Sequence, residues 1–520
     1  MSEHDDSVLD QAFSTTAYEP TLKVWSDQQK AIHQEFADGT GHLVIRAFAG
    51  TGKTTHILEG ISHAPERRIM LCAFNKRIQE ELTRRLQNPN AQAKTLHALG
   101  YGCVSRYWEH MRPCAPSYLR ARTLTDAVVG DQAPDAMKRL VSTLHTKARE
   151  MAPLASSAGD LLDIAYQFDC VPDEEWEVFG YDVGWVEQMA LKAMGLAAEK
   201  KPIATGIDFA DMIFLPVRNR WMRPMYDLVV VDECQDMSAA QLTLAQGLCG
   251  GRIVAVGDSF QAIYAFRGAD STSLDRLTTE LSAKVLPLSV TYRCGRAIVE
   301  EARRFVPDFE ASPLNGPGLV TDLPYEKMGA AVQLGDFILS RKNAPLASVA
   351  MSLIRAQIRV QVAGKDIGAG LKALVEKLSK AKNSIPAFLD KLVEWESREC
   401  VRALKADREE QVQGIQDKGE TLRVLCEGVT GVKELTARID GLFTDDGLGA
   451  KGVVTCSSVH KAKGLQANRV FVLKDTLTPF RKRGAKGPAV PTQEERNIEY
   501  VACTRAIDEL VWVHGLPGDC

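Results

Sequence analysis

The stretch VIRAFAGTGKTTHIL, residues 44–58, joins a β-branched run to a glycine-rich turn that ends in a lysine. In a phosphate-binding loop, backbone N–H groups and a helix N-terminus face the phosphates, a lysine neutralises their oxygens, and a hydroxyl takes a magnesium position. Lys53 and Thr54 suit the last two roles. The common motif has glycine six residues before the lysine, where this chain has Ala47. That position ends the expected strand, so a methyl group is tolerable there. The candidate loop is Ala49, Gly50, Thr51, Gly52, Lys53, Thr54 and Thr55.

A second strand-like run, YDLVVVDECQD, ends in the adjacent acids Asp232 and Glu233. Two acids at the carboxyl end of a buried strand suit nucleotide hydrolysis, with Asp232 on Mg²⁺ and Glu233 activating the attacking water. Taken alone, the pair is also compatible with an exposed acidic turn. Phosphoryl transfer further needs positive charge on the γ-phosphate, for which Arg293 and Arg505 are candidates, with surface arginines as the alternative.

Seven fragments follow one another in an order that resembles the superfamily 1 helicases of the UvrD/Rep/PcrA type. They are WSDQQKAI, AGTGKTT, DECQD, GDSFQAIYAFRGA, TYRCGRAI, VHKAKGLQANRVFVL and EERNIEYVACTRA. This resemblance implies ATP and Mg²⁺ as cofactors. It also implies further nucleotide contacts, namely Gln29 on adenine, Gln261 sensing the γ-phosphate, Tyr292 against adenine, Arg293 and Arg505 as arginine fingers, and Gln466 near the ribose. The chain departs from the family at Gln466, where a glutamate is usual, and at Thr55, where many members carry an arginine over adenine.

The same resemblance implies a single-stranded DNA track. Such strands are held by stacking of bases on aromatic rings, worth about 1–3 kcal/mol per base, together with a basic groove. The implied contacts are Phe74, Asn75, Thr95, His97, Tyr264, Phe266 and His460. Phe266 stands in place of the family's tryptophan and keeps a ring face. Phe74 as a core residue and the histidines as turn residues are the alternatives. The basic loop RKRGAKG, residues 481–487, is either a solvated loop or a grip on the DNA backbone.

Eight short apolar runs, most of them followed by helical patterns, predict parallel strands covered by helices on both faces. We therefore expect an α/β protein with two doubly wound parallel-sheet domains, each interrupted by a mainly helical insertion; the resemblance implies that these domains are RecA-like. The predicted segments are a disordered acidic N-terminus (1–20), domain 1A (21–103 with 204–285), insertion 1B (104–203), domain 2A (286–374 with 450–520) and a reduced insertion 2B (375–449).

Composition limits the class of protein further. The 520 residues are 45% hydrophobic and 25% charged with a net charge of −4, so any DNA contact must come from a local surface. The 12 cysteines form no CxxC pair, which argues against a structural zinc or an iron–sulfur cluster. No apolar run is long enough to span a bilayer, and no membrane partner is expected. We expect a protein of the bacterial or phage-type cytoplasm, associated with the nucleoid when bound to DNA.

The sequence thus predicts an ATP-dependent 3′ to 5′ single-stranded DNA translocase and helicase, acting in repair, replication or recombination. Its partners would be single strands and single-strand/double-strand junctions, with a protein loading partner left open. One alternative is a DNA-activated ATPase subunit of a larger defence or recombination complex without unwinding of its own. Another is a nucleotide-dependent protein switch. The second finger and the strand contacts disfavour a switch, which needs neither.

Overall fold

The computed structural model describes residues 25–38, 40–107, 117, 119–130, 132–199, 206–264, 272–379, 384–405, 409–444, 452–477 and 491–516. The predicted N-terminal segment 1–20 lies outside these residues. The chain divides into two compact units, Asp27–Ser289 and Val290–Cys520 together with Met1–Ser26. Each unit is described by itself.

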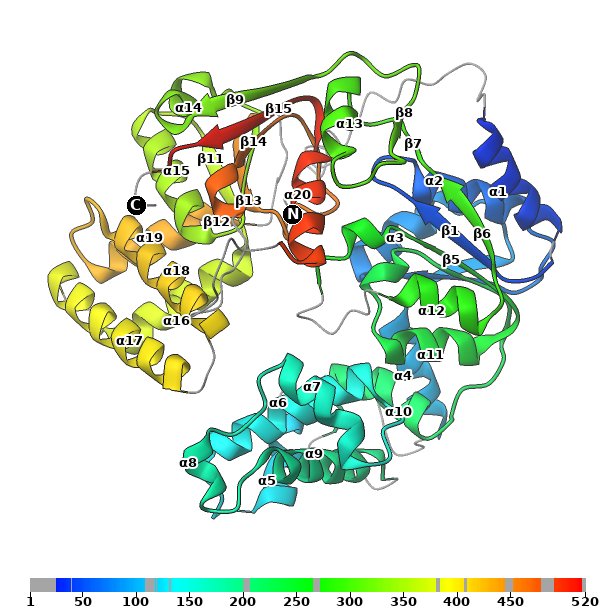
Figure 1. Ribbon diagram of the computed structural model, residues 1–520, viewed down its shortest axis with the longest axis horizontal. Helices are drawn as coiled ribbons and strands as arrows, with labels where there is room; N and C mark the ends of the chain where they lie inside the picture. The colour runs from blue at the N-terminus through cyan, green and yellow to red at the C-terminus, as the bar shows by residue number, and fades with distance from the viewer. Residues whose placement is uncertain are drawn as a thin grey trace, which may run out of the picture. The chain divides into compact units, whose positions relative to one another are not determined.

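The unit Asp27–Ser289, coloured blue to green in Figure 1, is built on a parallel sheet. Its strand order is β3-β2-β4-β5-β1-β6. Its strands are β1 (Leu43–Ala47), β2 (Ile69–Ala73), β3 (Ala91–Thr95), β4 (Tyr226–Val231), β5 (Cys249–Gly257) and β6 (Lys284–Leu288). The inner strands are rich in valine, isoleucine and leucine because helices cover both faces of the sheet. Those helices are α1 (Asp27–Asp38), α2 (Lys53–His63), α3 (Lys76–Arg85), α4 (Leu96–Tyr107), α10 (Phe209–Arg218), α11 (Ala239–Leu248) and α12 (Ser273–Glu280).

Alternate residues of the strands pack on opposite layers of helices. On one face, Ile45 of β1 joins Ile32 and Ile57 from α1 and α2 in a common core. On the other face, Val44 of the same strand joins residues of α4, α10, α11 and α12. This alternation follows from the two-residue period of a strand, which places successive side chains on opposite faces of the sheet.

The second unit is also built on a parallel sheet, with the order β12-β11-β13-β10-β14-β15-β9. Its strands are β9 (Leu319–Pro324), β10 (Phe337–Ser340), β11 (Val360–Ala363), β12 (Phe443–Thr444), β13 (Val454–Ser458), β14 (Ala467–Leu473) and β15 (Ala506–His514). A short pair, β7 (Val290–Thr291) and β8 (Glu310–Ala311), stands apart. The accompanying helices are α13 (Arg296–Ala302), α14 (Tyr325–Ala331), α15 (Asn343–Arg355), α16 (Lys365–Leu378) and α20 (Gln493–Cys503).

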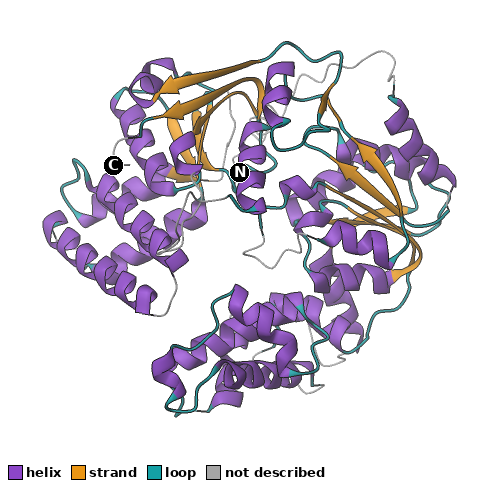
Figure 2. Cartoon of the chain, in the orientation of Figure 1, coloured by secondary structure: helices purple, strands orange, loops and turns teal. Residues whose placement is uncertain are grey.

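Each sheet is interrupted by helices, which Figure 2 shows in purple. The first insertion contains α5 (Arg120–Val129), α6 (Asp135–Met151), α7 (Leu162–Gln167), α8 (Glu174–Glu177) and α9 (Val183–Ala198). The second contains α17 (Ile385–Lys405), α18 (Glu409–Cys426) and α19 (Val432–Leu442). The predicted fold class, two parallel-sheet α/β domains with helical insertions, is confirmed. No helix within the described part of the chain is both long and apolar enough to cross a membrane.

Candidate functional site

The predicted nucleotide residues follow three neighbouring strands of the first sheet. The loop follows β1, the two acids follow β4, and residues 258–264 follow β5, which lies between β1 and β4. Because the strands are parallel, their carboxyl ends meet at one edge of the sheet, where α/β proteins of this kind bind ligands. The fold therefore brings together segments that are about 200 residues apart in the chain.

The glycine loop is shaped for close approach by an anion. Gly50 and Gly52 have positive φ angles of 69° and 83°, a backbone conformation that glycine adopts without strain. The buried Thr51 donates its hydroxyl proton to the carbonyl oxygen of Phe48 over 2.9 Å, which fixes the turn. Helix α2 begins at Lys53, and its N-cap residue Gly52 supplies no side-chain acceptor. The first N–H groups of the helix thus have no competing side-chain cap, as a phosphate site requires.

The predicted magnesium residues lie side by side. The Thr54 hydroxyl is 3.5 Å from Oδ2 of Asp232, which is only 5% exposed. Burial and then the neighbouring Glu233 carboxylate raise the pKa of Asp232, whereas the charge of Lys53 lowers it. The Thr54 hydroxyl and the buried Asp232 carboxylate are oxygen donors of the kind that Mg²⁺ prefers. A bound cation would also stabilise the charged form of this buried carboxylate. The residues present therefore fit the expected metal.

The second acid and the segment after β5 form a polar cluster. Glu233 has a positive φ of 50°, which is uncommon outside glycine. Its carboxylate accepts a 2.5 Å hydrogen bond from the side-chain amide of Gln235, a residue that the sequence analysis did not consider. Gln261 donates its amide to Oδ2 of Asp258 over 2.6 Å. Burial raises the pKa of Asp258 and the charge of Lys53 lowers it, as the same charge lowers the pKa of Asp232.

The predicted adenine residue has a neighbour that sequence reasoning missed. Gln29 lies on the buried face of α1 and is 3% exposed. Gln28 exchanges two hydrogen bonds with Ser289, of 2.9 and 3.0 Å, through its amide nitrogen and oxygen. Ser289 directly follows β6, whose last residue, Leu288, accepts the N–H of Phe48 over 3.1 Å. These bonds hold Gln28 beside the glycine loop. In the sequence, the hint of this position is that Gln28 stands directly before Gln29.

Predicted DNA contacts follow β2 and β3 at the same edge of the sheet. The rings of Phe74 and Tyr264 are stacked, with centroids 6.5 Å apart and planes 11° apart. His97 meets the ring of Phe209 edge-on, with centroids 5.9 Å apart, and burial lowers the pKa of His97. The Phe209 side chain is 52% exposed, and the sequence analysis did not select it. Phe266 lies outside the described residues.

Two of the predicted DNA residues also cap helices. The Asn75 side chain accepts the backbone N–H of Ile78 over 2.9 Å at the start of α3. The Thr95 hydroxyl accepts the backbone N–H of Ala98 over 3.2 Å near the start of α4. Asparagine and threonine are preferred in this role because their short side chains reach the unpaired N–H groups of the first turn. These residues thus have a structural function independent of DNA.

In the second unit, the two predicted arginine fingers lie close together, next to Thr504. The Arg293 guanidinium donates to the carbonyl oxygen of Thr504 over 3.2 Å, and Arg505 is the next residue in the chain. Arg505 is 2% exposed and donates to the carbonyl oxygens of Val501 and Leu465, each over 3.1 Å. The fold therefore brings together two arginines that are 212 positions apart in the sequence.

The remaining predicted residues of this unit lie on its surface. Tyr292 is 43% exposed, and Gln466 is exposed just before β14. The guanidinium of Arg341 lies 3.0 and 2.8 Å from the two ring nitrogens of His460, so it donates to this ring. Loop 481–487 lies outside the described residues.

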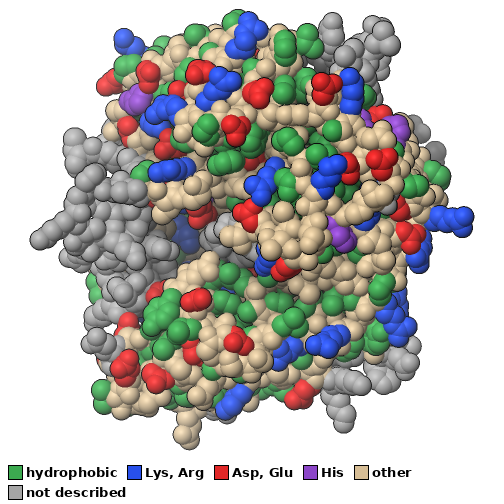
Figure 3. Space-filling model, turned by 45° about the vertical axis from the view of Figure 1, so that its right-hand side comes forward, with side chains coloured by type: hydrophobic (Ala, Val, Ile, Leu, Met, Phe, Trp, Pro, Cys, Tyr) green, Lys and Arg blue, Asp and Glu red, His purple; other side chains and the backbone are tan. Residues whose placement is uncertain are grey.

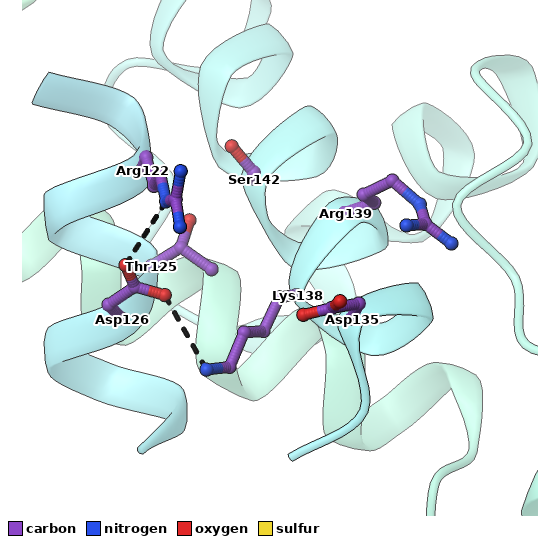
Figure 4. Close-up of a pocket in the computed structure, with 7 residues that line it drawn as sticks. All are labelled: Arg122, Thr125, Asp126, Asp135, Lys138, Arg139 and Ser142. Atoms are coloured by element: carbon purple, nitrogen blue, oxygen red, sulfur yellow. Dashed lines mark ion pairs between the residues drawn. The ribbon is translucent and has the colours of Figure 1, made fainter. Parts of the chain in front are cut away.

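The surface carries no segregation of charge in the view of Figure 3, where acidic and basic side chains are interspersed. A surface pocket lies between α5 and α6, and the close-up in Figure 4 shows its lining. Asp126 there lies 3.6 Å from both Arg122 and Lys138, so the pocket's charges are partly paired. None of the predicted site residues lines it. Within the described residues, no group of three or more histidine, cysteine, aspartate or glutamate side chains is placed to hold a metal ion.

Comparison with known proteins identifies two helicase domains in this chain. The model of the UvrD/REP helicase N-terminal domain matches residues 25–282, and that of the UvrD-like helicase C-terminal domain matches residues 435–514. A solved arterivirus nonstructural protein 10 helicase with DNA aligns with a TM-score of 0.35 at 10% identity, covering 95% of this chain and 63% of that one. That similarity is too low to inform the site.

Three curated relatives match over most of this chain. F-box DNA helicase protein 1 of Schizosaccharomyces pombe is 23% identical over 95% of this chain and 58% of its own length. ATP-dependent DNA helicase UvrD2 of Mycobacterium tuberculosis is 26% identical over 94% of this chain and 78% of its own. ATP-dependent DNA helicase Rep of Escherichia coli is 26% identical over 61% and 46%. This chain thus spans less than two thirds of the length of two of these relatives.

The two matched segments fall on different α/β units. The first contains the glycine loop and both acids, and the second contains Arg505. The strand order places the loop and the acids at one edge of the first sheet. With both domain models matched and this geometry in place, the chain belongs to the UvrD/Rep-like family of ATP-dependent DNA helicases.

Proposed function

We propose that this protein hydrolyses ATP to move 3′ to 5′ along single-stranded DNA and to separate strands, in DNA repair, replication or recombination. One observation carries the proposal. A single sheet edge holds the phosphate loop and acids after β1, β4 and β5, and the stacked pair of Phe74 and Tyr264 after β2 and β5. His97, which follows β3, meets the ring of Phe209 at the start of α10. A nucleotide site and a stacking surface on one rigid sheet are what a DNA-driven motor needs.

The chemistry follows from the side chains. Lys53 and the N-terminus of α2 hold the β- and γ-phosphates, and Glu233 takes a proton from the attacking water. Thr54 and Asp232 would hold Mg²⁺, which would supply positive charge against the charge that develops on the phosphates. Gln261 contacts the γ-phosphate. On this proposal ATP is hydrolysed between the two RecA-like domains.

The second domain supplies the remaining nucleotide contacts. Arg293 and Arg505 offset the charge that develops on the leaving phosphate. Tyr292 packs on adenine, which Gln29 of the first unit also contacts, and Gln466 lies near the ribose. These roles rest on the family resemblance and on the hydrogen bond that Arg293 donates to Thr504, the residue before Arg505.

The DNA path uses aromatic faces of the first unit. Bases stack on Phe74, Tyr264 and Phe266, while Asn75 and Thr95 contact the backbone. The exposed ring of Phe209 extends this surface beside His97. His460 completes the path from the second unit. The polarity rests on the resemblance of the segment GDSFQAIYAFRGA to 3′ to 5′ members of the family.

A second candidate is a DNA-activated translocase subunit of a larger complex that does not unwind by itself. The observation that favours it is the small second insertion, in which the described helices run only from Ile385 to Leu442. In that case a loading partner would supply strand separation. In either case we place the protein in a bacterial or phage-type cytoplasm, bound to single strands or junctions.

An unwinding assay with 3′-tailed and 5′-tailed duplexes tests the proposal. We expect ATP-dependent separation of the 3′-tailed duplex only. Lys53→Ala should abolish separation and hydrolysis while single-strand binding persists; Lys30→Ala, on the exposed face of α1, is the matched control.

A parallel assay measures displacement of streptavidin from a 5′-biotinylated single strand. Displacement without unwinding would favour the subunit alternative, and ATP turnover that does not respond to single-stranded DNA would contradict both.

A further inference from the structure

A side-chain amide that no proposed role has used lies in the polar cluster after β4. Gln235 is 0% exposed and belongs to the short turn Cys234–Asp236. Its amide nitrogen donates to Oε2 of Glu233 over 2.5 Å, and its amide oxygen accepts the backbone N–H of Asp258 over 3.0 Å. The orientation of the amide is fixed, because only the oxygen can face an N–H donor and only the nitrogen can face a carboxylate.

The close approach of Gln235 to the end of β5 depends on a glycine. A Cβ atom at Gly257 would lie 2.5 Å from Oε1 of Gln235 and 3.3 Å from its backbone nitrogen. Any larger residue at position 257 would therefore displace the amide. Glu233 and Asp258 are 25 positions apart in the sequence, but they follow the neighbouring strands β4 and β5. The bridge between them depends on the close approach that Gly257 allows at the end of β5.

Two features of Glu233 require that neighbouring residues hold it in place. Its backbone is in the left-handed region, with φ of 50°, where a residue with a side chain persists only when its surroundings hold it. A general base must also lie within hydrogen-bonding reach of the water it activates, so its carboxylate has to be held in one orientation. The amide of Gln235 holds one of the two carboxylate oxygens, Oε2, in place.

The same bridge reaches the segment that carries the other proposed contacts. The Asp258 carboxylate accepts the amide of Gln261 over 2.6 Å and the backbone N–H of Phe260 over 3.1 Å. Three residues beyond Gln261, Tyr264 stacks on Phe74. Gln235 therefore links the Glu233 carboxylate to Asp258, the first residue of the segment 258–264. That segment ends at Tyr264, whose ring stacks on Phe74.

We propose that Gln235 is a positioning residue for ATP hydrolysis, which holds the Glu233 carboxylate toward the attacking water in register with residues 258–264. This inference rests on the proposed role of Glu233 as the general base. Gln235 itself touches neither nucleotide nor DNA. Its effect on the rate must therefore pass through Glu233, and this requirement makes the proposal testable.

A double-mutant cycle between positions 233 and 235 tests it. Gln235→Met keeps the length of the side chain but removes the donor and the strong acceptor. With saturating oligothymidylate, we expect kcat to fall about 10- to 100-fold, as for a misplaced catalytic group, with KM for ATP within about threefold of the parent value. In a Glu233→Gln background, measured under single-turnover conditions, Gln235→Met should change the rate by less than about twofold.

Two further variants make the result specific. Gln235→Glu keeps an oxygen for the Asp258 N–H but places a second carboxylate against Glu233, and it should lower kcat as Gln235→Met does. Gln246→Met is the control, because Gln246 donates to Glu280 over 3.1 Å in an exposed pair of the same chemistry. Binding of a fluorescent ATP analogue and the thermal midpoint of each variant show whether the folded site is retained.

The outcomes separate this inference from the proposed function. An equal loss of rate in both backgrounds would show that Gln235 acts independently of Glu233 and would overturn the inference. So would variants of Gln235 that fold, bind nucleotide and turn over like the parent protein. If the parent protein's turnover does not depend on Lys53, the proposed function itself fails instead.

Discussion

Among single residues, some predicted DNA contacts already have a structural task. Asn75 and Thr95 each accept a backbone N–H in the first turn of a helix. Replacing such a cap by alanine typically costs about 0.5–2 kcal/mol of stability. An alanine variant at either position would therefore lose helix stability together with the proposed DNA contact. Separating the two effects needs a substitution that keeps the cap.

A pair of variants at Asn75 makes this separation. Asn75→Asp keeps the capping oxygen but brings a negative charge toward the phosphates, so we expect an unchanged thermal midpoint and weaker single-strand binding, by roughly tenfold at low salt. Asn75→Ala should lower the midpoint through the lost cap. Fluorescence anisotropy with labelled oligothymidylate and thermal unfolding measure the two effects. Unaltered affinity in Asn75→Asp would remove this residue from the DNA path.

Among secondary-structure elements, the first insertion is tied to α10 by buried charges. Arg149 pairs with Asp208 and Asp211, each at 2.8 Å, and Arg120 pairs with Asp211 at 2.9 Å. Both aspartates also cap the start of α10. Phe209 lies between them in sequence, and its ring meets His97. The helices of the first insertion, which contributes no strand to the sheet, thus fix the aromatic side chain of Phe209 at the edge of the sheet. Removing one partner of such a buried network is costly because it leaves a charge unpaired.

His145 makes the stability of this insertion depend on pH. Burial, followed by the charge of Arg149, lowers its pKa to about 3, although the carbonyl of Ala121 and the charge of Asp208 oppose this shift. Below the ordinary histidine value of about 6.5, the unfolded chain binds a proton that the folded chain does not. This histidine's contribution to stability therefore falls as the pH drops from about 6.5 toward 3, by up to about 1.4 kcal/mol per pH unit.

His145→Gln tests this dependence. Glutamine can donate to the Ala121 carbonyl oxygen but does not titrate, so the loss of thermal stability between pH 7 and pH 5 should be smaller than in the parent protein. His63→Gln is the control, because the His63 side chain is 47% exposed. A pH dependence that His145→Gln leaves unchanged would contradict the prediction.

For the whole molecule, the proposed nucleotide residues are divided between the two units. Lys53, Asp232 and Glu233 belong to the first, whereas Arg293 and Arg505 belong to the second. On the proposed mechanism, the first unit binds the phosphates and the second raises the rate. Arg505 is buried and donates to two carbonyl oxygens, so its removal would also disturb the fold. Arg293, half-buried, is the better probe.

Arg293→Ala should separate binding from rate. We expect the affinity for a fluorescent ATP analogue to stay within about threefold, while DNA-stimulated kcat falls by about 10³, the lower end for loss of an arginine finger. Arg304→Ala, at a 64% exposed side chain paired with Glu301, is the control. A fall in affinity that accounts for the whole loss of turnover would assign Arg293 to nucleotide binding alone.

The sequence predicted the inner strands better than the edges of the sheets. All eight apolar runs became strands, because a strand covered on both faces must be apolar along its length. The structure adds β3 and β6 at the two edges of the first sheet and β9 at an edge of the second. Only one residue of β3 and one of β6 are buried, and none of β9. Edge strands like these carry a weak pattern because one side of each has no neighbouring strand.

By itself, the sequence determined the local chemistry: the glycine loop, the paired acids, the family to which the motifs belong and the α/β class. Those features depend on residues close together in the chain. The tertiary structure decided which of them are neighbours, since β5 lies between β1 and β4. It alone revealed that Gln28 binds Ser289 and that Gln235 joins Glu233 to Asp258. The physical reason is that a strand's apolar pattern specifies burial but not its partner, which long-range packing selects.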